Sequence, residues 1–124
     1  MWNGINRRKF PRANYKCIIT IKKRLTAKTI STHTENLGAG GICVLIKEDL
    51  GLFQGVDLEI MLEDSNTPVK CGGTVVWVVK KSEPKQKASY LYDTGIEFID
   101  IRPEDRDRIT AVVDLILKRK VYSK

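Results

Sequence analysis

The sequence predicts an all-β domain, a six-stranded antiparallel β-barrel with a C-terminal α-helix. Three observations indicate this class. Six segments between residues 15 and 99 show the period-two alternation or the short apolar run of a β-strand. Short polar connections separate these segments, and the hydrophobic period becomes helical only after Pro103. A sandwich has a similar pattern, but we expect a barrel because closure leaves no exposed strand edge.

The length and composition indicate a single domain. A chain of 124 residues with 42% hydrophobic residues is large enough for one core and too small for two. No apolar run approaches the roughly 18 residues of a membrane span, and residues 1–15 lack the apolar stretch of a secretory signal. We expect a basic arm at residues 1–14, a barrel domain at residues 15–124, and a cytoplasmic location.

The first three predicted strands lie at residues 15–25, 27–37 and 42–46. In the first, the side chains that share the apolar face are Tyr15, Cys17, Ile19 and Ile21. The second is polar and rich in β-branched residues. The stretch Gly38-Ala-Gly-Gly41 interrupts the pattern before the third segment, which is short and wholly apolar and therefore predicts a buried strand.

The last three strands are predicted at residues 56–62, 69–80 and 88–99. The first of these has the clearest alternation in the chain. Turn-forming residues at 64–68 predict that the next strand returns as a hairpin, and a second polar connection covers residues 82–87. A helix is expected over about residues 103–119, because apolar residues follow the spacing i, i+3, i+4 and i+7: Ile109, Val112, Val113 and Ile116.

Neither the cysteines nor the histidine indicates an enzyme or a cofactor. Cys17, Cys43 and Cys71 are odd in number and lack metal-ligand spacing, which argues against disulfides and zinc and favours buried thiols. His33 lies in a polar strand without a nearby nucleophile or a cluster of acidic residues, so we expect a surface side chain. We therefore expect no catalytic residue, no bound metal and no cofactor.

The positive charge is concentrated near the N-terminus. Residues 1–25 hold eight basic and no acidic side chains, whereas the rest of the chain holds 14 basic and 15 acidic ones. Within this segment Arg7, Arg8 and Arg12 form a dense guanidinium cluster. Arginine binds phosphate or the O6/N7 edge of guanine with two parallel hydrogen bonds, and it stacks on a base. Pro11 favours an extended or bent backbone around the cluster.

A second candidate binding feature lies between the second and third predicted strands. Asn36 offers an amide for hydrogen bonding to a base edge, and the glycines that follow, including Gly38 and Gly41, let the backbone approach a ligand closely. These glycines do not form a phosphate-binding loop, because they precede a strand and lack the Lys-Ser/Thr pair of such a loop.

Together these two features resemble the signature of the PilZ domain family, bacterial receptors for the second messenger cyclic di-GMP. Arg8-Lys-Phe-Pro-Arg12 matches the family's R-x-x-x-R motif. Asn36 and Gly41 match its [D/N]-x-S-x-x-G motif, whereas Gly38 occupies the serine position. The resemblance continues through residues 73–78, residues 94–98 and the closing helix, so it covers nearly the whole chain.

The resemblance implies a non-enzymatic sensor or adaptor whose ligand is cyclic di-GMP, often as a self-stacked dimer. In the family, the arginines clasp guanines and phosphates, and the second motif meets a guanine from the barrel surface. An N-terminal arm ordered around the nucleotide would then signal to an unidentified partner protein. Loss of one hydrogen bond at Gly38 is worth about 1 kcal/mol, so it should weaken binding about five- to tenfold without abolishing it.

Two other functions remain open. A PilZ-like module that binds protein and no nucleotide is favoured by Gly38 and disfavoured by the intact arginine pair. A nucleic-acid binder would use the basic arm electrostatically, but the sequence shows neither an aromatic ladder nor a recognition helix. We therefore expect no nucleic-acid partner.

The role of Trp77 is ambiguous in the sequence. Val75, Trp77 and Val79 share one face of the predicted strand, but the opposite face is apolar too, so the period does not identify the core side. Core packing is favoured over contact with a nucleotide, although the resemblance implies the latter at this place in some members. Gly95 either permits close approach of a ligand or relieves barrel curvature.

Overall fold

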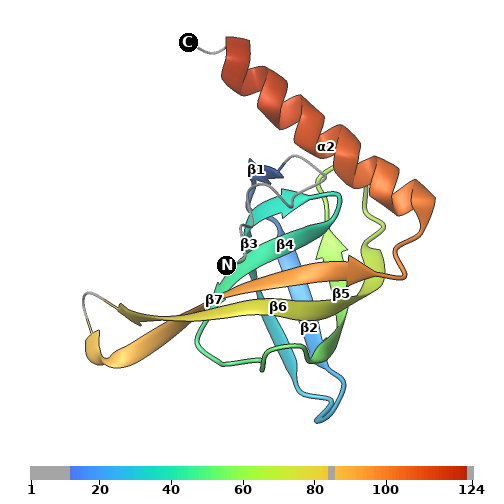
Figure 1. Ribbon diagram of the computed structural model, residues 1–124. Coiled ribbons are helices and arrows are strands. Elements are labelled where there is room, and N and C mark those ends of the chain that lie inside the picture. Colours follow the sequence, from blue (N-terminus) through green and yellow to red (C-terminus); the bar gives the residue numbers. More distant parts are fainter. Residues whose placement is uncertain (1–11, 84–85, 123–124) are drawn as a thin grey trace.

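The structure, a computed structural model, describes residues 12–83 and 86–122 and is drawn in Figure 1. Its elements are β1 (Arg12–Asn14), β2 (Ile18–Lys23), β3 (Thr29–Gly38), β4 (Gly41–Ile46), β5 (Gly55–Met61), β6 (Val69–Glu83), β7 (Gln86–Ile99) and α2 (Pro103–Tyr122). The predicted barrel and closing helix are confirmed.

Six strands form the closed ring. The sheet order is β1-β3-β2-β5-β6-β7-β4, and a further pairing of β3 with β4 closes a ring that leaves β1 outside. All of these pairings are antiparallel. The short strand β1 is the seventh and pairs with residues 36–38 of β3, beyond the part of β3 that pairs with β2. Each strand of the ring therefore has two neighbours.

The predicted first strand is interrupted. It was expected from Tyr15, but β2 begins at Ile18, and residues 12–14, expected in an irregular arm, form β1. The interruption has a side chain as its cause. The Thr34 hydroxyl accepts a hydrogen bond from the Cys17 amide at 3.1 Å and donates to the Tyr15 carbonyl at 2.7 Å. In the segment between β1 and β2, these side-chain bonds accompany two backbone bonds, from the Tyr15 amide to the Glu35 carbonyl at 3.3 Å and from the Thr34 amide to the Cys17 carbonyl at 2.9 Å.

The barrel interior is a single apolar core to which every strand of the ring contributes. Its side chains alternate along the strands as the period of two predicts. The fully buried ones with the largest volume include Ile19, Ile21, Leu37, Ile42, Leu58, Ile60 and Ile96. Ile109 and Val113 from α2 complete the core, with 0% and 1% of their surface exposed. The predicted apolar stripe of the helix is therefore confirmed.

An ion-pair network attaches α2 to the barrel. The buried carboxylate of Asp105 accepts hydrogen bonds from Arg102 at 3.0 Å and from Arg108 at 3.3 Å. Arg108 also donates to both carboxylate oxygens of Asp64, each at 2.9 Å, and to the Thr67 carbonyl at 2.7 Å. The N-terminal half of the helix thus lies on the barrel, whereas its C-terminal half projects beyond it (Figure 1).

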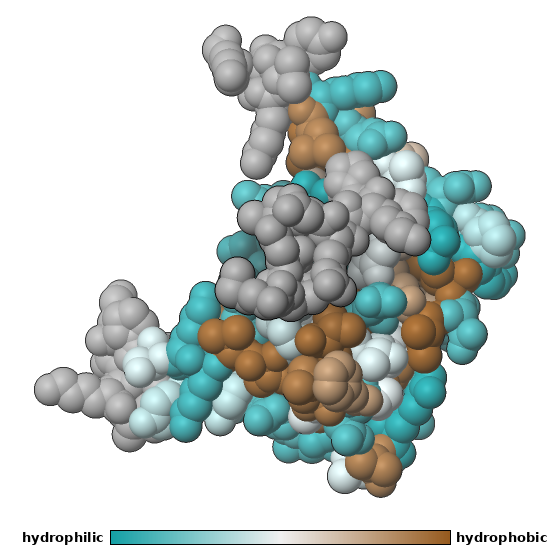
Figure 2. Space-filling view, viewed as in Figure 1, coloured by the Kyte–Doolittle hydropathy of each residue, from teal (hydrophilic) through white to brown (hydrophobic). Residues whose placement is uncertain are grey.

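The β6–β7 hairpin is longer than predicted. Residues 82–87 were expected to be a connection, but pairing continues through Ser82↔Tyr90 to Glu83↔Gln86. The hairpin consequently extends past the barrel wall in Figure 1. In Figure 2, hydrophilic side chains cover much of the described part of the hairpin, whereas apolar side chains gather on the lower half of the barrel. In the described part of the chain, no helix combines the length and apolarity needed to cross a membrane.

Candidate functional site on the outer face of the barrel

A β-bulge in β3 turns two consecutive polar side chains toward the outside of the barrel. Thr34 pairs with Val44 and Asn36 with Cys43, so Glu35 is the extra residue. Thr34 and Leu37, on either side, are 1% and 0% exposed. Because both flanking side chains are buried, Glu35 and Asn36 share the outer face, which a regular strand would not allow.

Arg12 is held against the same face. Its strand, β1, pairs with β3 so that Arg12 lies opposite Gly38. The Arg12 Nη1 atom donates a hydrogen bond to Asn36 Oδ1 at 3.2 Å, and its guanidinium lies 5.7 Å from the centroid of the Trp77 ring. Arg12 thus contacts two other residues that were predicted for the site. The other two predicted arginines, Arg7 and Arg8, lie outside the described residues.

Trp77 lies on the outer surface, so the favoured prediction of core packing is wrong. A second irregularity, between Val75 and Trp77, shifts the register of β6 against β7 and places Trp77 opposite Gly95. A Cβ atom at Gly95 would lie 2.3 Å from two atoms of the indole ring, so the ring covers the Gly95 backbone. Val75 is fully buried while Trp77 is half-buried, because the bulge breaks the alternation that would have put both on one face.

The two predicted glycines lie at the end of this face, and one of them, Gly41, allows two strands to come close. A Cβ atom at Gly41 would lie 2.3 Å from the carbonyl oxygen of Ile96. Strand β4 therefore approaches β7 more closely here than a residue with a side chain at position 41 would allow. Gly38 is buried and pairs with Arg12 on one side and with Gly41 on the other. Gly38 therefore lies beside Arg12 in the sheet, and Gly41 lies one strand further away.

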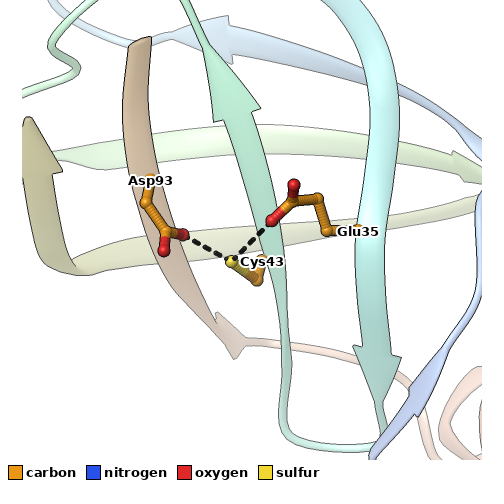
Figure 3. Close-up of side chains that lie close together, drawn as sticks. All are labelled: Glu35, Cys43 and Asp93. Atoms are coloured by element: carbon orange, nitrogen blue, oxygen red, sulfur yellow. Dashed lines mark hydrogen bonds between the residues drawn. The ribbon is translucent and has the colours of Figure 1, made fainter. Parts of the chain in front are cut away.

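Figure 3 shows a thiol and two carboxylates close together, those of Cys43, Glu35 and Asp93. Cys43 pairs with Asn36 across β3 and β4, so the cluster lies beside Asn36. Cys43 Sγ is 2.8 Å from Asp93 Oδ1 and 3.9 Å from Glu35 Oε2. Burial, the hydrogen bond to Asp93 and the charges of both carboxylates raise the pKa of the Cys43 thiol to about 12. The thiol is therefore protonated near neutral pH and donates to Asp93.

The cluster is held together without an ion. Its three possible ligand atoms lie within 4.8 Å of one another, and a metal ion bound there would have to displace the proton that the Cys43 thiol donates to Asp93. The Lys81 ammonium also lies 3.4 Å from Asp93 Oδ2 and already balances its charge. The arrangement instead offers hydrogen-bond acceptors to a ligand on the outer face.

The structure adds residues that the sequence did not single out for the site, namely Glu35, Cys43 and Asp93. No sequence pattern marks the bulge that turns Glu35 outward. Cys43 was expected to be buried, and it is 4% exposed, but its thiol faces the outer cluster rather than the apolar core. His33, predicted to be a surface residue, is exposed.

The sequence matches the family profile described as "PilZ domain" over residues 6–115. No curated protein matches the chain.

Solved structures share the fold at low sequence identity. The PilZ domain with c-di-GMP of YcgR from Escherichia coli is 12% identical with a TM-score of 0.71, and the match covers 95% of this chain and 98% of that one. The K. pneumonia MrkH–c-di-GMP complex is 14% identical with a TM-score of 0.76, covering 95% and 55%. The Bacillus subtilis inhibitor of motility (MotI/DgrA) is 20% identical with a TM-score of 0.70, covering 95% and 53%. This chain therefore spans about half the length of MotI and MrkH.

Proposed function

The chain belongs to the PilZ domain family, and we propose that it is a cyclic di-GMP receptor and not an enzyme. The observation that carries the proposal is the contact of Arg12 with both Asn36 and Trp77 on the outer face of the barrel. The structures of the YcgR PilZ domain and of MrkH with c-di-GMP support it, since they share this fold.

The chemistry of the face fits such a ligand. Cyclic di-GMP is a dianion with two guanines, so it requires positive charge and flat surfaces for stacking. The Arg12 guanidinium supplies charge and paired donors, and the half-buried Trp77 ring supplies an aromatic surface. Gly38 lacks the hydroxyl of the family's serine, so we expect an affinity about five- to tenfold lower than the full motif would provide.

We further propose that the arm orders around the nucleotide, bound as a self-stacked dimer, and that the complex signals to a partner protein in the bacterial cytoplasm. The position of β1 supports this. Its pairing with β3 places Arg12 on the site, and residues 1–11, with Arg7 and Arg8, directly precede it in the chain. A segment that folds on binding changes the surface available to a partner.

A protein-interaction module without nucleotide binding is the second candidate. It is favoured by Gly38 at the serine position and by exposed apolar side chains on the loop before β5. Phe53 is 72% exposed and Leu52 is 50% exposed. The Phe53 amide bonds to the Val75 carbonyl at 2.8 Å, which ties this loop to β6, the strand that carries Trp77.

Calorimetric titration with cyclic di-GMP tests the proposal. We expect saturable binding by the wild-type protein and at least a tenfold loss in Arg8→Ala and Arg12→Ala. Arg24→Ala is the matched control, because it removes the same charge from an exposed side chain that pairs with Asp57 of β5. GMP and single-stranded DNA serve as control ligands.

The outcomes separate the candidate functions. Wild-type protein that releases no heat with cyclic di-GMP contradicts the receptor and favours the protein module. Binding only to DNA, with an affinity that falls steeply as salt rises, favours a nucleic-acid binder.

A further inference from the structure

Glu35 is an unexpected charge in a site proposed for a dianion. The β3 bulge turns its side chain outward beside Asn36, and the residue is exposed. Removing water from a carboxylate next to phosphate groups is unfavourable unless hydrogen-bond donors of the ligand meet it. Guanine has such donors, the N1–H and the N2 amino group, side by side on its Watson–Crick edge.

Asn36 as it lies in the structure does not satisfy these donors. Arginine has only donors, so the hydrogen bond from Arg12 engages the Asn36 oxygen. The remaining Asn36 Nδ2 group only donates. It suits the guanine O6 or N7 acceptor and leaves the N1–H and N2 amino group without a partner.

Of the two carboxylates near Asn36, Glu35 is the one available to a ligand. Asp93 accepts the Cys43 thiol at 2.8 Å and lies 3.4 Å from the Lys81 ammonium. Within residues 12–83 and 86–122, Glu35 forms no ion pair, and its contact with the Cys43 sulfur is long, at 3.9 Å. Because the Cys43 sulfur lies much closer to Asp93 than to Glu35, both Glu35 oxygens remain able to accept.

We propose that Glu35 is a specificity-determining residue that accepts from guanine N1–H and the N2 amino group, while Asn36 Nδ2 donates to O6. This inference rests on the proposed function of the same face. It assigns base selection to a carboxylate on the bulge, next to the motif residue. Adenine has neither an N1–H nor an N2 amino group, so the arrangement selects cyclic di-GMP over cyclic di-AMP.

The test measures the affinity of both cyclic dinucleotides for three proteins by calorimetry: wild type, Glu35→Gln and the control Glu59→Gln. Glu59 is an exposed carboxylate on β5, so its substitution removes the same charge elsewhere on the barrel. We expect Glu35→Gln to weaken cyclic di-GMP about tenfold or more, the range of a paired base contact, without weakening cyclic di-AMP. Glu59→Gln should change neither affinity more than twofold.

The sign of the effect decides between recognition and repulsion. If Glu35 only repels the phosphates, Glu35→Gln will bind both dinucleotides as tightly as wild type or more tightly, and the inference is overturned while the receptor function stands. If wild type does not bind cyclic di-GMP, both fail together. Circular dichroism of Glu35→Gln checks that the exposed substitution leaves the fold intact.

Discussion

Replacing Gly95 by alanine tests whether the Trp77 ring truly lies on the Gly95 backbone. The added Cβ would lie 2.3 Å from atoms Cδ2 and Cε2 of the ring and 2.4 Å from Cε3. Ordinary contact begins at 3.4 Å, so the ring must move by about 1.1 Å. Gly95 has no positive φ, so the alanine backbone itself is unstrained.

Two opposing effects set the magnitude. Overpacking costs about 1–3 kcal/mol, and we expect about 1–2 kcal/mol because the half-buried ring has room to move outward. Alanine is favoured over glycine inside a strand by about 0.5–1 kcal/mol. Gly95→Ala should therefore lower the free energy of unfolding by about 0.5–1 kcal/mol, and it should also move the ring away from Arg12.

A double-mutant cycle isolates the ring contact. In a Trp77→Ala background the clash is absent, so Gly95→Ala should stabilise the protein by about 0.5–1 kcal/mol. Urea unfolding followed by circular dichroism measures all four proteins. An equal effect of Gly95→Ala in both backgrounds would refute the placement of the Trp77 ring on the Gly95 backbone.

Three further predictions concern other parts of the molecule. The hydrogen bonds from Arg108 lower the pKa of Asp64. The stabilisation from this pair is therefore complete above the ordinary carboxyl pKa near 3.9 and is lost as the pH falls through the lowered pKa. In urea unfolding, Arg108→Ala should lower the free energy of unfolding by about 1–3 kcal/mol at pH 7 and by less at pH 3, and equal losses at the two pH values would contradict this. Because its pKa is raised to about 12, the Cys43 thiol should react slowly with iodoacetamide at pH 8, and Asp93→Asn should speed the reaction. Mass spectrometry measures the modification of Cys43. An unchanged rate in Asp93→Asn would show that the Asp93 carboxylate does not raise the pKa of the thiol. Gly38→Ser should raise the affinity for cyclic di-GMP about five- to tenfold in calorimetry, and no gain would show that the missing hydroxyl is irrelevant.

The fold was largely predictable from the sequence because its main signals are local. A period of two with intervening turns identified six strands, and the spacing of Ile109 and Val113 identified the buried side of the helix. What the sequence missed involves contacts between distant segments. The Thr34 hydroxyl, which interrupts the first strand, forms hydrogen bonds with Cys17 and Tyr15, which precede it by 17 and 19 positions.

The site was predictable in part. Motif spacing selected Arg12 and Asn36, which lie in contact, but their binding of a nucleotide stays a prediction. The rest of the site could not be predicted because of two β-bulges. One extra residue in a strand reverses the face of every side chain that follows, and no residue type marks where this happens. For this reason the face of Trp77 and the outward position of Glu35 required the structure.

Locating cyclic di-GMP on the barrel is the most direct test of the proposed site. Two-dimensional NMR of the ¹⁵N-labelled protein during a cyclic di-GMP titration reports every backbone amide and the tryptophan indole groups. We expect the largest shifts at Glu35, Cys43, Gly95 and the Trp77 indole, with small shifts at Glu59 on β5. Absence of shifts, or shifts centred on β2 and β5, would contradict a cyclic di-GMP site on the outer face of β3, β4, β6 and β7.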